Sequence, residues 1–95
     1  MLNKCLIFTS ETCKDCFALK SNFTKLTEEF PMVKFEFIDV DQNPQAGIDH
    51  QIYTLPSVEL YDNNQLIAEF KHGQNKQYTH ILNFIKLHME LSRRK

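Results

Sequence analysis

The chain has 95 residues, with 11 Lys and Arg against 12 Asp and Glu, so its formal net charge at pH 7 is −1. This balance gives no general attraction for nucleic acids or anionic membranes, and no apolar stretch is long enough to span a bilayer. With 42% hydrophobic residues, including eight Phe, a single domain over residues 1–95 can bury a core without disulfides to stabilise it.

The predicted elements begin with a buried strand at residues 4–8, a short apolar run that is followed by a polar loop at 9–12. From Cys16 onward, apolar residues recur at steps of three and four, the spacing of one buried helix face, until Pro31 ends the helix. We predict one continuous helix there, with Cys13 at its start. Its apolar face comprises Leu19, Phe23, Leu26 and Phe30, and the aromatic Phe17 is likewise interpreted as a packing residue.

The middle of the chain is predicted to hold three strands and a short helix. Alternating apolar and charged residues predict a strand at 33–40, and the turn signal Asp-Gln-Asn-Pro follows at 41–44. The short helix is predicted at 45–51. Two further β-like runs, 57–61 and 66–70, are separated by a four-residue polar loop of the kind that joins an antiparallel hairpin.

A last helix is predicted after Gly73, which makes the order of elements β-α-β-α-β-β-α. Strands joined through a helix pair in parallel by a right-handed crossover, and strands joined by a hairpin pair antiparallel. We therefore predict an α/β fold in which a four-stranded mixed sheet is covered by helices on both faces. The apolar face of the last helix comprises Tyr78, Ile81, Leu82, Ile85 and Met89.

The three cysteines form one close pair, Cys13 and Cys16, and one odd member, Cys5. The first residues lack the long apolar stretch and cleavage site of a secretory signal, so we expect a cytoplasmic protein. In that reducing compartment structural disulfides are rare, and a pair of cysteines is expected to be catalytic or metal-binding. Cys5 lies in an apolar run, where a cysteine usually acts as a small buried hydrophobe.

Cys13 and Cys16 are candidate catalytic residues for thiol–disulfide exchange, and they are expected at the carboxyl end of the first strand. The free backbone N–H groups and the dipole of a helix start favour an anion, so the pKa of Cys13 is expected to be depressed. Cys16 lies one turn further along and can attack a mixed disulfide on Cys13, which makes it the resolving thiol. Lys14 favours the thiolate and Asp15 opposes it, so both are expected to modulate the pair.

A Cys-x-x-C pair can also be half of a zinc site, but such sites usually add a second Cys or His pair with comparable spacing. The four histidines of this chain are scattered and offer no such pair. We therefore predict no metal site and no cofactor.

Three motifs resemble those of the thioredoxin family. They are Thr-Cys-Lys-Asp-Cys at 12–16 after a strand, Asp-Gln-Asn-Pro at 41–44 after the next strand, and Thr-Leu-Pro-Ser at 54–57 before the hairpin. Gly73 follows the last strand as in the family. The resemblance covers nearly the whole chain from Lys4 onward, and it implies a minimal thioredoxin-like fold that lacks the family's N-terminal β-α unit.

The resemblance also implies a substrate-binding segment. In the family, the residue that matches Pro56 forms a cis peptide bond facing the two cysteines, and the backbone of the residue that matches Leu55 pairs with substrate. Leu55 and Pro56 are therefore expected to bind substrate, together with Thr12, which stands directly before the first cysteine.

The chain departs from the family pattern in three ways that concern mechanism. Lys14 and Asp15 replace the usual Gly-Pro, so the family's reduction potential does not transfer. Thr12 replaces a Trp, which removes a flat aromatic contact surface. Ile7 replaces the buried Asp that assists proton transfer from the resolving cysteine, so deprotonation of Cys16 needs water or another acid or base.

The function implied by the resemblance is reduction of disulfides in other proteins, with recycling by a thioredoxin-reductase-like flavoenzyme. A glutaredoxin-like enzyme recycled by a low-molecular-weight thiol is the nearer alternative. From a different class, a non-catalytic binding module that senses redox state or holds a metal remains open, because the motif is altered and the usual proton acceptor is absent.

We expect a monomer. Without the family's first strand, the strand at 33–40 becomes a sheet edge, where Lys34 and Glu36 can guard against unwanted pairing. The alternative hypothesis is that this edge mediates a dimer.

Overall fold

The computed structural model describes residues 1–71 and 77–94. Gly73, which the sequence places after the last strand, lies outside the described residues. Within them, the elements follow in the order β1 (Lys4–Thr9), α1 (Lys14–Ser21), α2 (Thr24–Glu29), β2 (Lys34–Asp39), α3 (Pro44–Asp49), β3 (Ser57–Asp62), β4 (Gln65–Phe70) and α4 (Tyr78–Arg93). The predicted β-α-β-α-β-β-α order is confirmed, except that the first helix is divided.

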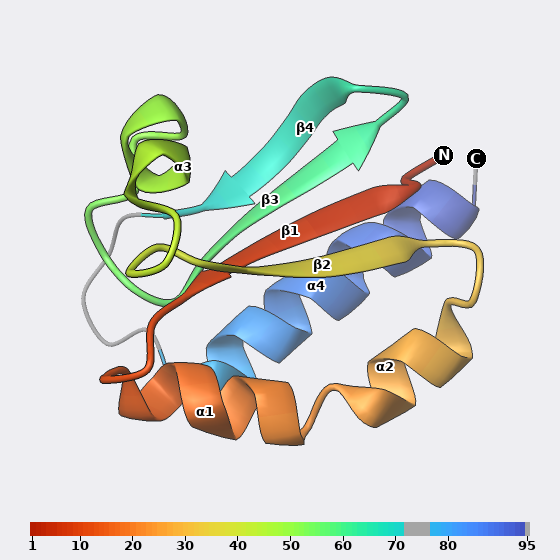
Figure 1. Ribbon diagram of the computed structural model, residues 1–95. Helices are drawn as coiled ribbons and strands as arrows, with labels where there is room; N and C mark the ends of the chain where they lie inside the picture. Colours follow the sequence, from red (N-terminus) through yellow and green to blue (C-terminus); the bar gives the residue numbers. More distant parts are fainter. Residues whose placement is uncertain (72–76, 95) are drawn as a thin grey trace.

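The four strands form one mixed sheet in the order β2-β1-β3-β4 (Figure 1). β1 pairs in parallel with β2, its neighbour across a helical connection, and antiparallel with β3. β3 and β4 form an antiparallel hairpin. β2 is therefore an edge strand, as predicted, and the carboxyl end of β1 lies beside the start of β3.

The division of the first helix occurs at Asn22 and Phe23, where no proline stands. The Asn22 side chain donates to the Ala18 carbonyl at 2.7 Å, and the Ser21 hydroxyl donates to the Phe17 carbonyl at 3.0 Å. Because polar side chains that bond to helix carbonyls compete with the regular backbone pattern, α1 ends here and α2 starts anew. The buried stripe nevertheless continues across the break through Leu19, Phe23, Leu26 and Phe30.

The β3–β4 connection is tighter than the predicted four-residue loop. Only Asn63 and Asn64 lie between the strands, and both have positive φ, 50° and 69°. Asparagine tolerates this left-handed region better than most residues, and two successive residues there suit the twist of a hairpin.

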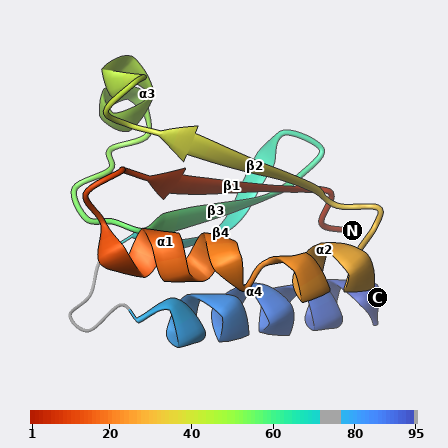
Figure 2. The same ribbon diagram turned by 60° about the horizontal axis from the view of Figure 1, so that its bottom comes forward.

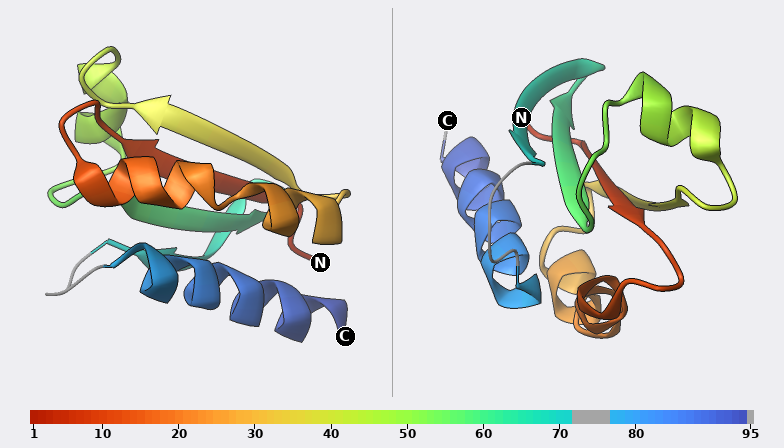
Figure 3. Two further views of the ribbon diagram at one scale, coloured as in Figure 1. Left: turned by 90° about the horizontal axis from the view of Figure 1, so that it is seen from below. Right: turned by 90° about the vertical axis from the view of Figure 1, so that its left-hand side faces the viewer.

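Helices lie on both faces of the sheet but cover them unequally (Figures 2 and 3). α1, α2 and α4 pack on one face, whereas α3 lies on the other side, beyond the carboxyl end of β2 (Figure 1). None of the helices in residues 1–71 and 77–94 has the length and apolar character needed to cross a membrane. The core between sheet and helices is built from Cys5, Ile7, Leu19, Phe23, Val58, Leu60, Ile81, Ile85 and Met89.

Candidate active site

The two cysteines of the motif form a disulfide at the start of α1. Cys13 is the N-cap residue, with extended backbone angles, and its sulfur accepts a hydrogen bond from the Cys16 backbone N–H at 3.1 Å. The two Cα atoms are 5.2 Å apart, within the usual range for a disulfide. The Cys13 sulfur thus accepts a hydrogen bond from one of the backbone N–H groups that have no partner within the helix.

The two sulfur-bearing residues differ in exposure. Cys16 is only 2% exposed, because it shares the inner side of α1 with the buried Leu19, whereas Cys13 is half-buried. Lys14 and Asp15, the first two residues of α1, are both exposed. The sequence-based expectation that Cys16 is the less accessible sulfur is confirmed, so a disulfide partner can reach Cys13 first.

The segment before β3 lies at the same end of the sheet as the cysteines (Figures 1 and 2). The Leu55–Pro56 peptide bond is cis, as the resemblance implies. Ser57, the next residue, is the antiparallel partner of Phe8, which stands five positions before Cys13. The register of the sheet therefore carries this segment to the end of β1. Pro56 is buried, Leu55 is partly exposed, and Thr12, directly before Cys13, is exposed.

An open pocket of about 370 Å³ lies beside Cys16. Phe17 is one of its walls and is 76% exposed, so the interpretation of Phe17 as a packing residue is wrong. The buried stripe of the helix runs through Cys16, Leu19 and Phe23, and the next residue after Cys16 is turned about 100° away from that stripe. The remaining walls of the pocket are Thr9, Ser10, Glu11, Lys20, Asp39 and Gln42.

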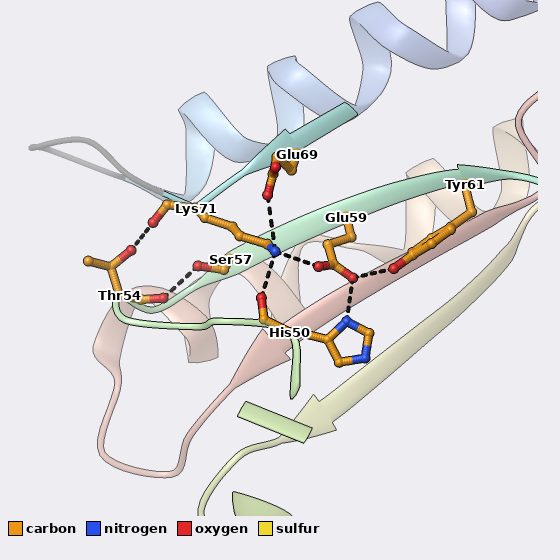
Figure 4. Close-up of polar contacts among 7 residues, drawn as sticks. All are labelled: His50, Thr54, Ser57, Glu59, Tyr61, Glu69 and Lys71. Atoms are coloured by element: carbon orange, nitrogen blue, oxygen red, sulfur yellow. Dashed lines mark hydrogen bonds and ion pairs between the residues drawn. The ribbon is translucent and has the colours of Figure 1, made fainter. Parts of the chain in front are cut away.

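A buried polar network, not anticipated from the sequence, includes Thr54 and Ser57, the two residues that flank Leu55 and Pro56 (Figure 4). Its centre is Glu59 of β3, which is 2% exposed. One carboxylate oxygen lies 2.6 Å from the Lys71 ammonium, and the other accepts from the Tyr61 hydroxyl at 2.6 Å and contacts His50 Nδ1 at 2.8 Å. The Lys71 ammonium also lies 3.0 Å from a carboxylate oxygen of Glu69.

These contacts shift the pKa values of the groups involved. Burial alone would raise the pKa of Glu59, but hydrogen bonds from Lys71 and Tyr61 and the nearby positive charges hold it below its usual value. Burial would lower the pKa of Lys71, but Glu59 and Glu69 raise it above its usual value. Burial and the hydrogen bond to Glu59 raise the pKa of Tyr61. Glu59 and Lys71 are therefore a charged pair at neutral pH.

The fold and the site together define a class of protein. A Cys-x-x-Cys disulfide at a helix start, on a mixed sheet of this order and with a cis-proline segment at the same end of the sheet, is the arrangement of thiol–disulfide oxidoreductases with a thioredoxin-like fold. The thioredoxin family model matches residues 3–87. The chain belongs to the thioredoxin family.

Individual relatives agree with this assignment. A thioredoxin of Ophiophagus hannah is 31% identical over 70 residues, which covers 74% of this chain and 66% of the relative. Thioredoxin 1 of Thermosipho africanus superposes with a TM-score of 0.74 at 26% identity, covering 95% of this chain and 98% of that one. Oxidised mitochondrial thioredoxin 3 of Saccharomyces cerevisiae superposes with a TM-score of 0.72 at 28% identity, covering 87% of this chain and 76% of that one. The chain spans about two thirds of the length of the curated relatives it matches.

Proposed function

We propose that the protein reduces disulfides in other proteins through a Cys13/Cys16 dithiol–disulfide couple. The observation that carries this proposal is the placement of Cys13 at the N-cap of α1, where its sulfur accepts the Cys16 N–H and lies at the same end of the sheet as the Leu55–Pro56 segment. The N–H groups of a helix start stabilise a thiolate there, and the thiolate is the attacking species in exchange.

The reaction starts from the reduced dithiol. The Cys13 thiolate attacks one sulfur of the substrate disulfide, which forms a mixed disulfide and releases the other substrate sulfur as a thiolate that takes up a proton. Cys16 loses its proton and attacks the Cys13 sulfur, so the second substrate sulfur leaves. Two electrons have then passed to the substrate, and the protein holds the Cys13–Cys16 disulfide found in the structure.

Residues around the pair are assigned supporting roles in this proposal. Thr12, Leu55 and Pro56 contact the substrate, and the backbone of Leu55 pairs with an extended substrate segment. Lys14 and Asp15 tune the stability of the Cys13 thiolate, because one positive and one negative charge stand on the first turn of α1.

The proposed partners are proteins with accessible disulfides and an electron donor. A thioredoxin-reductase-like flavoenzyme is the proposed donor, and a low-molecular-weight thiol is the alternative. Comparing the rate of recycling by a flavoenzyme with the rate by glutathione separates the two. We also propose a cytoplasmic location, where the dithiol form is maintained.

The experiment that tests the function follows reduction of insulin, a protein with accessible disulfides, with dithiothreitol as the electron source. Wild-type protein is expected to accelerate the reaction. Cys13→Ser is expected to abolish the acceleration, and Cys16→Ser is expected to accumulate a mixed disulfide. Cys5→Ala is the matched control, since burial raises the pKa of the Cys5 thiol and keeps it unreactive. Full activity of Cys13→Ser would contradict the proposal, and no acceleration by the wild-type protein would favour the non-catalytic module.

A further inference from the structure

The polar network centred on Glu59 contacts the proposed substrate segment through Lys71, which bonds to the His50 carbonyl and the Thr54 hydroxyl. Val58 and Leu60, its neighbours in β3, belong to the core beneath α4, so Glu59 points to the opposite face of the sheet, where α3 lies. His50, the residue at which α3 ends, contributes its ring to the network. The ring also contacts Phe8 of β1, with ring centroids 5.0 Å apart.

Lys71 ties the segment between α3 and β3 at two points. Its ammonium donates to the His50 carbonyl at 2.6 Å, at the start of the segment. Its own carbonyl accepts the Thr54 hydroxyl, one residue before Leu55. The Thr54 carbonyl in turn accepts the Ser57 hydroxyl at 2.5 Å (Figure 4). Lys71, which directly follows β4, therefore contacts the segment that carries Leu55 and Pro56 at both His50 and Thr54.

The burial of this charged pair needs a reason beyond stability. Glu59 and Lys71 are 2% and 8% exposed, and taking two charges out of water is costly, so apolar residues of similar volume often stabilise a fold equally well. An apolar pair, however, has no directional contact with the His50 carbonyl. A directional network defines one position of the segment, where an apolar contact permits several.

We propose that Glu59 and Lys71 are positioning residues that hold the Thr54–Leu55–Pro56 backbone in the orientation that receives a protein substrate. The inference rests on the proposed disulfide reduction and adds a determinant of substrate binding on the far face of the sheet. Lys71 fixes the segment, and Glu59 fixes Lys71 together with Glu69. Neither residue takes part in sulfur chemistry.

The test compares two disulfides with full-length variants Lys71→Met and Glu59→Gln. For insulin, whose chain must pair with the segment, the KM is expected to rise about tenfold with kcat unchanged, the signature of lost binding rather than lost chemistry. For dithiobis(nitrobenzoate), a small disulfide without a peptide backbone, kcat/KM is expected to stay within twofold. Lys34→Met and Glu36→Gln, which change exposed residues of β2, are the matched controls and are expected to behave as wild type.

Hydrogen exchange of peptides over residues 50–57 gives a readout that does not depend on activity. Exchange in this segment is expected to be at least fivefold faster in both variants, with exchange in β1 unchanged. If Lys71→Met does not fold, the milder Glu59→Gln carries the test. Unchanged exchange and unchanged KM in a folded variant would overturn the inference and leave a purely structural pair. If wild-type protein does not reduce insulin, the proposed function fails, and the exchange result still decides the positioning role.

Discussion

Phe17 and Phe23 illustrate how a difference of a few positions on one helical stretch decides the role of a residue. Both are aromatic, but Phe23, at the start of α2, is buried against Phe35 and Phe37, whereas Phe17 of α1 is exposed beside Cys16. Helical spacing predicts which residues share a face, and Phe17 does not share the face of Phe23 once Cys16 and Leu19 define it.

The two positions therefore differ in their expected effect on stability. Phe23→Ala should lower the free energy of unfolding by about 3–5 kcal/mol, because it removes a buried ring and leaves a cavity. Phe17→Ala should change it by no more than about 0.5 kcal/mol, as for a typical exposed side chain. Urea unfolding of the two variants beside wild type measures both values. Equal destabilisation would show that Phe17 packs in the core after all.

Glu59 gives the molecule a predicted sensitivity to acid. Its pKa is lower in the folded protein than its ordinary value of 4.5, so the folded state binds the proton less tightly than the unfolded chain does. The stability that this group contributes is fully present when the pH is above its ordinary pKa. It is lost as the pH falls through the lower pKa of the folded state. The free energy of unfolding should therefore decline below pH 4.5.

Urea unfolding of wild type, Glu59→Gln and the exposed control Glu36→Gln across the acid range tests this dependence. Glu59→Gln should be less stable than wild type at neutral pH and should lose less stability on acidification. Glu36→Gln should keep the wild-type slope. Parallel slopes for wild type and Glu59→Gln would mean that Glu59 does not carry the effect.

The sequence alone predicted much of the site but not all of it. The Cys13–Cys16 pair and the Leu55–Pro56 segment follow from motifs, because their chemistry depends on residues close together in the chain. The Glu59 network could not be derived in this way. Alternation in β3 indicates which face a residue occupies, but its partners come from the end of α3 and from the residue after β4, and only the tertiary fold brings them together.

At the scale of elements, the strands and α4 were predicted closely, whereas the first helix was not. The helical spacing of apolar residues continues from Leu19 to Phe30, so this spacing gives no sign of the break between α1 and α2. The break depends on side-chain hydrogen bonds of Ser21 and Asn22 to helix carbonyls, which compete only locally with the helix.

β2 is an exposed edge whose behaviour can be tested. Lys34 and Glu36 are exposed on it, and charges on an edge strand disfavour pairing with a second chain. We therefore expect a monomeric mass by light scattering at high protein concentration. A dimeric mass would support the alternative, a dimer formed through this edge.

At the scale of the whole molecule, one core connects the sheet with α1, α2 and α4, which supports the proposal that residues 1–95 form one domain. Thermal unfolding is then expected to show one cooperative transition, with equal calorimetric and van't Hoff enthalpies. Two separate transitions would contradict a single domain.

The placement of the redox site also follows from the whole fold. Cys13 is positioned by the loop after β1, and the Leu55–Pro56 segment is positioned by the register of β3 on β1. The Cys13 sulfur and the Leu55–Pro56 segment therefore come to the same end of the sheet only when the sheet is assembled, although they are more than 40 positions apart in the sequence.

The central claim is that Cys13 and Cys16 form a reversible dithiol–disulfide couple. Its most direct test is the equilibrium reduction potential of the pair, measured by thiol trapping in defined dithiol/disulfide buffers with Cys16→Ser as control. We predict a reversible two-electron transition more reducing than the glutathione pool, whose potential is about −220 to −260 mV by extraction, and no such transition in the control. The absence of any reversible transition in wild-type protein would contradict the claim.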